Sequence, residues 1–364
     1  MFYQYKLWDT LMVVWVILLL AYQVALVRPD VRKSFSFTDA VVLGLAGLLS
    51  INFLRFHSGY QMYFKVLSAF LMYFVGRIYY DRIKECGGAL VAAAYIVVYA
   101  NLIDRIYRFG FSLTKVENAG GDFYFQDTDM AFAMILALVF ITMLGKNTVL
   151  KLVTIFLVCP YMILFSDAGI QVMLMLAIYF IFALYVVELA FRKKIAANCI
   201  LVVLLLGMVA LVTLLYLPVF GIDKDSFLPV FFHNRFLNNE NMKFRYATWI
   251  NAMQQTERGT LLQKLLGFGM GTDLEIDSLY IKIYYAMGWS GIVLTILFLL
   301  SILRKVARMD DRKTFYLLIM LAILLLGTGV TVNSIEYTQM SWFPMLFAGM
   351  VISSTVSEEN ELSF

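Results

Sequence analysis

Long apolar runs separated by short polar stretches make up most of the chain. A helix that crosses a bilayer needs about 20 mostly apolar residues, and such runs recur from one end of the sequence to the other. The runs show no alternation of apolar and polar positions, so we expect helices rather than the strands of a barrel. The pattern predicts an all-α, polytopic membrane bundle of about eleven transmembrane helices. The predicted helices span residues 10–27, 39–54, 60–80, 88–103, 129–145, 148–165, 169–190, 198–219, 279–303, 314–332 and 341–354.

The composition agrees with a membrane protein and excludes a water-soluble enzyme of this size. Hydrophobic residues make up 62% of the 364 positions and charged residues 15%, against about 45–50% and about 25% in soluble domains. The net charge of +4 is small, which indicates no nucleic-acid partner. Cys86 falls in a loop and Cys159 and Cys199 fall in spans, so we expect no disulfide and no cysteine metal site. The first run has no small-residue cleavage site, so it is expected to stay as a helix.

Positive charge in the loops predicts how the bundle is oriented. Short loops rich in Lys and Arg are retained in the cytoplasm. The odd-numbered loops hold fifteen such residues, whereas the short even-numbered loops hold four. This count places the N-terminus outside, residues 357–364 inside, and two longer loops, 104–128 and 220–278, outside. We expect a single domain over 1–364, in which the loop 220–278 is too long for a connection and too apolar to be disordered.

The loop 220–278 carries the signature of short amphipathic helices. Arg245, Trp249 and Met253 recur at a spacing of four, which places them on one helical face. Thr260 can cap a second helix over Leu261–Leu266, which Gly267 would end. We therefore expect these helices to lie on the membrane surface.

Charges along this loop fall into two zones. Residues 273–277 are acidic, at Asp273, Glu275 and Asp277, and residues 235–264 have a local charge of +3. Lys and Arg are usually retained in cytoplasmic loops, so basic residues in an outer loop need a reason. An anionic ligand is one such reason, because arginine binds phosphate oxygens bidentately. The alternative is a set of surface cations that meet lipid headgroups or nearby carboxylates. The five basic residues are Arg235, Lys243, Arg245, Arg258 and Lys264.

Asp277 ends the loop where the next predicted span begins. A partly buried carboxylate at a membrane mouth can serve as a general base; the alternative is an N-cap, a position that favours Asp. Lys282 lies one turn further along and can pair with Asp277 or reach a phosphate. Asp277 and Gly288 are expected to share one helical face, and Gly288 with Gly291 would let a neighbouring helix approach closely.

Together these residues resemble the outer-loop signature of the O-antigen polymerase and O-antigen ligase superfamily of bacterial surface polysaccharide synthesis. The resemblance covers about fifty residues, from Arg245 and Trp249 through the glycines at 267, 269 and 271 to the stretch between Asp277 and the glycines at 288 and 291. Many relatives have a His-Asn pair eleven residues before the first of these last glycines. Here Asp277 and Ser278 stand in that place.

The chain also departs from the family pattern. Relatives often carry an Arg at the outer entrance of the span that corresponds to 169–190, whereas this chain has Asp167 there. A second phosphate-binding arginine is therefore needed, and Arg235 is our choice. His57 and His233 do not match the catalytic position of the family, and we expect both to be structural.

The resemblance implies an inverting glycosyl transfer at the outer face of the bacterial cytoplasmic (inner) membrane, from a glycan on undecaprenyl pyrophosphate to a hydroxyl of another repeat unit. Asp277 would be the base and Arg245 the phosphate ligand. The implied partners are the undecaprenyl-pyrophosphate-linked oligosaccharides, membrane lipids and a chain-length regulator. No P-loop or dinucleotide motif is present, so no cofactor is expected; no metal is required either, although the acidic zone leaves a divalent ion open. The substrate-binding set would be Arg235, Lys243, Trp249, Tyr280 and Lys282.

Two other functions fit parts of the pattern. A ligase of the same superfamily would move the finished glycan to lipid A core or another acceptor, and the motifs do not separate it from a polymerase. A non-enzymatic flippase for the same lipid-linked sugars would carry charges along many spans and often paired halves. Here few charges fall within spans, the two halves of the chain do not repeat, and the additional predicted structure lies in one loop. This pattern favours a reaction at the membrane surface over transport. The charges within spans are Lys65, Lys151 and Glu188.

Overall fold

The computed structural model describes residues 11, 13–22, 35–56, 60–111, 127–146, 148–164, 169–191, 240–270, 276–309, 311–331, 334–336 and 338–361. Its regular structure over these ranges is helical and contains no strand, which confirms the all-α prediction. Four helices in these ranges are long and apolar enough to cross a membrane, so the chain is a helical membrane protein. They are α3 (Phe37–Phe56), α6 (Gly87–Phe109), α10 (Gly169–Phe191) and α15 (Leu279–Val306).

Every predicted run inside the described ranges holds helix, the first of them over Val13–Tyr22. The run 198–219 lies outside the described residues, and the count of eleven spans stays a prediction. The π-helical turn Thr154–Val158 precedes Pro160, whose missing N–H and ring bulk disturb a regular helix. The other elements are α4 (Tyr60–Ile78), α5 (Tyr80–Glu85), α7 (Asp127–Leu144), α8 (Val149–Val153), α9 (Cys159–Leu164), α13 (Glu240–Arg258), α14 (Leu261–Leu266), α16 (Arg312–Thr328), a 3₁₀ turn (Ser334–Glu336) and α17 (Thr338–Glu361).

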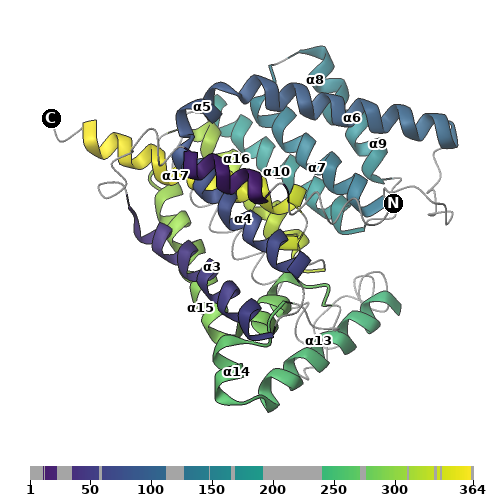
Figure 1. Ribbon diagram of the computed structural model, residues 1–364. Helices are drawn as coiled ribbons and strands as arrows, with labels where there is room; N and C mark the ends of the chain where they lie inside the picture. Colours follow the sequence, from purple (N-terminus) through teal and green to yellow (C-terminus); the bar gives the residue numbers. More distant parts are fainter. Residues whose placement is uncertain are drawn as a thin grey trace.

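Two apolar cores hold the bundle, and α17 contributes to both. The first core is built from α6, α7, the α8–α9 segment, α10 and α16, and the second from α3, α4 and α15 (Figure 1). Leu346 and Phe347 of α17 pack in the first core, while Met345 and Ala348 pack in the second. The helices α13 and α14 lie together at one end of the molecule, beside α15 (Figure 1).

The crossing of α4 and α17 depends on two glycines. A Cβ atom on Gly76 would overlap the carbonyl of Leu346, and one on Gly349 would overlap the carbonyl of Tyr73. Small residues let helix backbones approach in this way, which is the usual route to tight helix packing in membranes. The contact fixes α17 between the two cores.

A buried ion pair joins α3, α4 and α17 at one end of this crossing. Arg77 meets Asp39 with two bonds, Nε to Oδ1 and Nη2 to Oδ2, each 2.9 Å long. The hydroxyl of Tyr73 donates to Asp39 Oδ1 at 2.7 Å, and the backbone N–H of Ser36 donates to Oδ2 at 2.7 Å. Arg77 Nη1 also donates to Ser353 Oγ at 3.0 Å. Because both charges are buried, their stability depends on this complete set of partners.

A second buried carboxylate shows which helix ends lie together. Glu188 of α10 accepts from the Tyr316 hydroxyl at 2.7 Å and lies 3.2 Å from Arg312 Nε, at the start of α16. The C-terminal part of α10 therefore lies beside the start of α16. At the opposite end of α16, Gly329 O accepts from Leu279 N at 2.8 Å, which places the start of α15, and with it α13, at that end.

The Asp39–Arg77 pair predicts that removing a buried arginine lowers the free energy of unfolding far more than removing an exposed one. Replacing Arg77 by Met leaves a buried carboxylate without its cation, and the free energy of unfolding should fall by about 3–5 kcal/mol. Arg108 forms an exposed pair with Asp104. Replacing Arg108 by Met should change the free energy of unfolding by less than about 1 kcal/mol. Unfolding in SDS followed by circular dichroism measures both. Equal losses in the two variants would contradict a stabilising role for the buried network.

Candidate functional site

The helix α13 is attached to the bundle by one buried face. Tyr246, Trp249 and Ala252 are buried together with Ile281 and Tyr285 of α15. Trp249 is 0% exposed, and its ring meets that of Tyr246 edge-on with centroids 5.3 Å apart. Arg245, Trp249 and Met253 lie in the continuous helix α13 and therefore share one face, as expected. Trp249 is buried and the other two are partly buried. Trp249 therefore anchors α13 by packing.

The helix α14 has the capped ends that its sequence predicts. It spans Leu261–Leu266, with Thr260 as N-cap and a capping box in which the side chains of Thr260 and Gln263 each accept from the other's backbone N–H. Gly267 ends it at φ 82°, a conformation that only glycine adopts without strain. Both bounds and both caps are thus as predicted.

The helix α15 is interrupted at Gly288, where the backbone has φ 61° and ψ −160°. The shared face that the sequence predicts for Asp277 and Gly288 is therefore wrong, because Asp277 precedes the helix and Gly288 breaks it. A neighbouring helix does approach Gly288 closely, as predicted: a Cβ there would overlap the carbonyls of Lys264 and Leu265 of α14. The atoms nearest to a Cβ on Gly291 belong to Met287 and Ile283 of the same helix.

The turn after α14 satisfies the backbone groups that this break leaves open. The carbonyls of Tyr285 and Ala286 would find their helical donors beyond the break. Instead Phe268 N donates to Tyr285 O at 2.8 Å, and Gly269 N donates to Ala286 O at 3.0 Å. The side chain of Asn52, on α3, donates to Ala286 O at 2.9 Å. The glycine turn is thus bonded to the broken helix by its backbone.

Arg245 and Asp277, the two residues predicted to carry the chemistry, lie next to each other. Arg245 Nε is 3.4 Å from Asp277 Oδ2, although 32 residues separate them in sequence. Their side chains are 29% and 53% exposed, so the pair faces the outside of the described structure. An exposed pair of this kind contributes at most about 1 kcal/mol to stability. The partial burial expected for Asp277 is not present.

The alternative interpretation of Asp277 as a helix cap is wrong. The N-cap of α15 is Ser278, and Leu279 N donates to Gly329 O, so α16 supplies the acceptor at this helix start. The Asp277 carboxylate is directed to Arg245 instead.

The remaining predicted site residues fall into three groups. Lys243 is exposed on α13, close in sequence to Arg245. Tyr280 and Lys282 lie in the first turns of α15. The Tyr280 hydroxyl donates to Leu326 O at 2.7 Å, which favours packing over sugar contact for Tyr280. Lys282 is buried, at 5% exposed, and its expected role at a phosphate or beside Asp277 stays a prediction. Arg235 lies outside the described residues.

The Tyr246 hydroxyl, which lies on the buried face of α13, is poorly suited to act as a base. Burial raises the pKa of Tyr246 to about 12, so its hydroxyl keeps its proton near neutral pH. Among the described residues no three His, Cys, Asp or Glu side chains gather into a metal site. Asp273 and Glu275 of the acidic zone lie outside the described residues.

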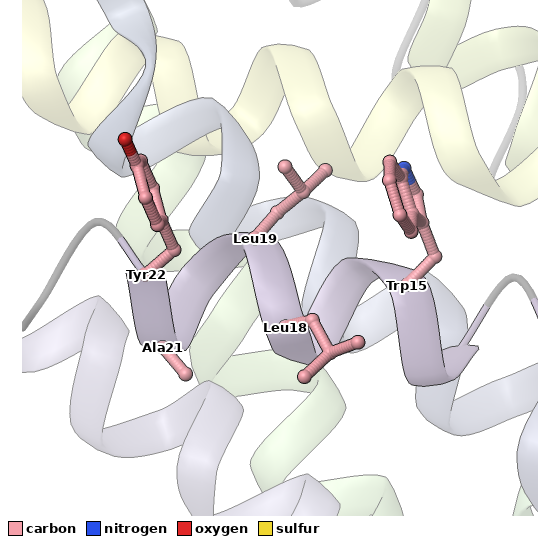
Figure 2. Close-up of a pocket in the computed structure, with 5 residues that line it drawn as sticks. All are labelled: Trp15, Leu18, Leu19, Ala21 and Tyr22. Carbon is pink, nitrogen blue, oxygen red and sulfur yellow. The ribbon is translucent and has the colours of Figure 1, made fainter.

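An apolar hollow of about 510 Å³ occurs elsewhere, along the helix Val13–Tyr22. In Figure 2, Trp15, Leu19 and Tyr22 project from one side of this helix and Leu18 from the other. The Tyr79 hydroxyl donates to Leu19 O at 3.0 Å, which places the helix beside the end of α4 that holds Arg77. The hollow is lined by apolar groups and is remote from Asp277, so we do not assign chemistry to it.

The fold and the site together define a helical membrane protein with a polar pair at one end of the bundle. No protein-family model matches the chain, and no curated protein sequence matches it.

The sequence analysis did not identify Asn52 of α3, whose side chain bonds to α14 and α15 beside the candidate site. The available signal was its polarity, since an amide near the end of the apolar run 39–54 needs partners once it is buried.

Replacing Gly288 by Ala should displace α14. The added Cβ would overlap the α14 carbonyls at a positive φ, and the free energy of unfolding should fall by about 1–3 kcal/mol. Trypsin should then cleave faster after Lys264. Gly47 offers the matched control, because a Cβ there meets nothing within 4 Å. If Gly288→Ala and Gly47→Ala gave the same cleavage rate, the close approach would not matter for docking.

Proposed function

We propose that the protein is a polymerase of bacterial surface polysaccharide that joins undecaprenyl-pyrophosphate-linked repeat units at the outer face of the cytoplasmic membrane. The observation that carries this proposal is the juxtaposition of Arg245 and Asp277 at 3.4 Å. Two segments far apart in sequence bring together a phosphate-binding group and a proton acceptor, in the order and spacing that resemble the O-antigen polymerase and ligase superfamily.

The proposed reaction uses the two groups at different atoms. The acceptor hydroxyl oxygen forms a bond to the anomeric carbon of the donor glycan while the bond from that carbon to the pyrophosphate oxygen breaks. Asp277 takes the hydroxyl proton, and Arg245 stabilises the charge that develops on the departing pyrophosphate. In the structure the pair bonds to itself, so a phosphate that binds Arg245 would release the carboxylate for the acceptor.

Exposure of the pair suits a substrate that arrives through the membrane surface. The polyprenyl chain would remain in lipid while the pyrophosphate reaches Arg245 from outside, and Lys243 lies on the same helix. Bound glycan would cover Asp277 and exclude water, which strengthens the electrostatic contribution of Arg245. The full proposed topology has eleven spans and the loop 220–278 outside.

Cysteine labelling tests this topology. Cys86 is exposed and falls in a loop assigned to the cytoplasm, whereas Ala247 is exposed on α13. In variants with one cysteine at either place, an impermeant maleimide added to intact cells should label Ala247→Cys and should label Cys86 only after permeabilisation. Labelling of both from outside, or the reverse order, would refute the assigned orientation.

Polymer formation tests the activity. Purified protein in liposomes, given undecaprenyl-pyrophosphate repeat units from the source organism, should produce a ladder of polymer lengths. Arg245→Ala should slow it by about 10²–10³-fold, and Asp277→Asn by about 10²–10⁴-fold.

Arg258, an exposed cation on the same helix, supplies the control: Arg258→Ala should keep the wild-type rate. Full activity of Arg245→Ala or Asp277→Asn would remove that residue from the mechanism. Transfer of a single glycan to a lipid acceptor without a ladder would identify a ligase instead.

A further inference from the structure

A buried amide joins the three segments that support the candidate site. Asn52 of α3 is 1% exposed, and its Nδ2 donates to Leu266 O at 2.5 Å and to Ala286 O at 2.9 Å. Leu266 is the last residue of α14, and Ala286 lies just before the break in α15. One NH₂ group therefore holds the end of one helix against the interruption of another.

The Asn52 NH₂ group donates to both acceptors, although Ala286 O also accepts from Gly269 N. Leu266 O belongs to the last turn of α14, where carbonyls lack helical donors. Within the described residues Asn52 Oδ1 is buried and has no hydrogen-bond partner, a cost of about 1–3 kcal/mol. The contribution of this side chain therefore comes from its two N–H groups, which an apolar residue of similar size could not replace.

Contacts continue from the break to Arg245. The Tyr285 ring stacks on Phe268 with centroids 5.1 Å apart, and its hydroxyl donates to Gln255 Oε1, on α13, at 3.0 Å. Tyr285 also packs in the same buried cluster as Trp249, one turn of α13 from Arg245. Displacing the turn at 267–269 from the break would therefore shift α13 relative to the start of α15.

We propose that Asn52 is a positioning residue that fastens α14 and the following turn to the interruption in α15 and thereby sets the placement of Arg245 beside Asp277. The physical part of this proposal is independent of any reaction. Its consequence for catalysis rests on the proposed function.

Replacing Asn52 by Asp gives a test that depends on pH. An ionised carboxyl facing two carbonyls repels them, whereas a protonated carboxyl supplies one donor. Desolvation and the facing carbonyls raise the pKa of the introduced carboxyl, so it should take up a proton on mild acidification. Hydrogen exchange, corrected for the intrinsic rate at each pH, should show protection of the Phe268 and Gly269 amides reduced by at least about tenfold at pH 8 and largely restored at pH 5.

Two further variants separate donation from packing. Asn52→Leu should lose protection equally at both pH values, and Asn251→Asp, the same change on the exposed face of α13, should match the wild type. Unchanged protection in Asn52→Asp at pH 8, or a loss that acid does not restore, would overturn the proposal. So would failure of this variant to fold at pH 5.

Polymer assays on the same samples connect the residue to function. The polymerisation rate of Asn52→Asp, relative to wild type at each pH, should follow the recovery of protection. If protection responds as expected while the wild type forms no polymer, the positioning role stands and the proposed function fails. If protection does not respond, the positioning role fails whatever the activity.

Discussion

The interruption of α15 at Gly288 is the constraint on which the arrangement of α13, α14 and the start of α15 depends. A broken helix leaves carbonyl groups without their regular donors, and in a poorly hydrated place each of them must find another. The turn after α14 supplies two backbone donors and Asn52 supplies a third. Because these bonds come from three segments, the break becomes the point at which α3, α14 and α15 are fixed relative to one another.

Much of this region could be predicted because it follows local rules. The bounds of α14, its capping box and its terminal glycine come from residues within a few positions of one another, and they agree with the structure. Inside the described ranges the apolar runs likewise gave the helix positions, because a helix satisfies its own backbone hydrogen bonds in apolar surroundings. The face containing Arg245 and Trp249 followed from helical spacing alone.

What could not be predicted depends on residues far apart in sequence. A glycine in an apolar run is compatible with a regular helix, so the positive φ of Gly288 appears only once α14 occupies the space beside it. The sequence around Asp277 is typical of an N-cap. In the structure, however, Leu279 N donates to Gly329 O, and the Asp277 carboxylate lies beside Arg245. The partners of Asn52 are more than 200 residues away, and no local pattern identifies them.

Asp39 and Asp277, two of the acidic residues that pair with arginine, show how differently a buried and an exposed ion pair respond to an incoming ligand. Asp39 has every oxygen engaged by Arg77, Tyr73 and Ser36, and a ligand could enter only by breaking several bonds in a dry environment. Asp277 makes one long contact with Arg245, and both side chains remain open to solvent. Exchanging that contact for a phosphate and a hydroxyl costs little, because exposed ion pairs are weak. Under the proposed function, the contacts from Asn52 through the break to Trp249 would keep the two groups close after the exchange. A weak ion pair on a rigid support is therefore the arrangement expected of a site that must open to a substrate without losing its geometry.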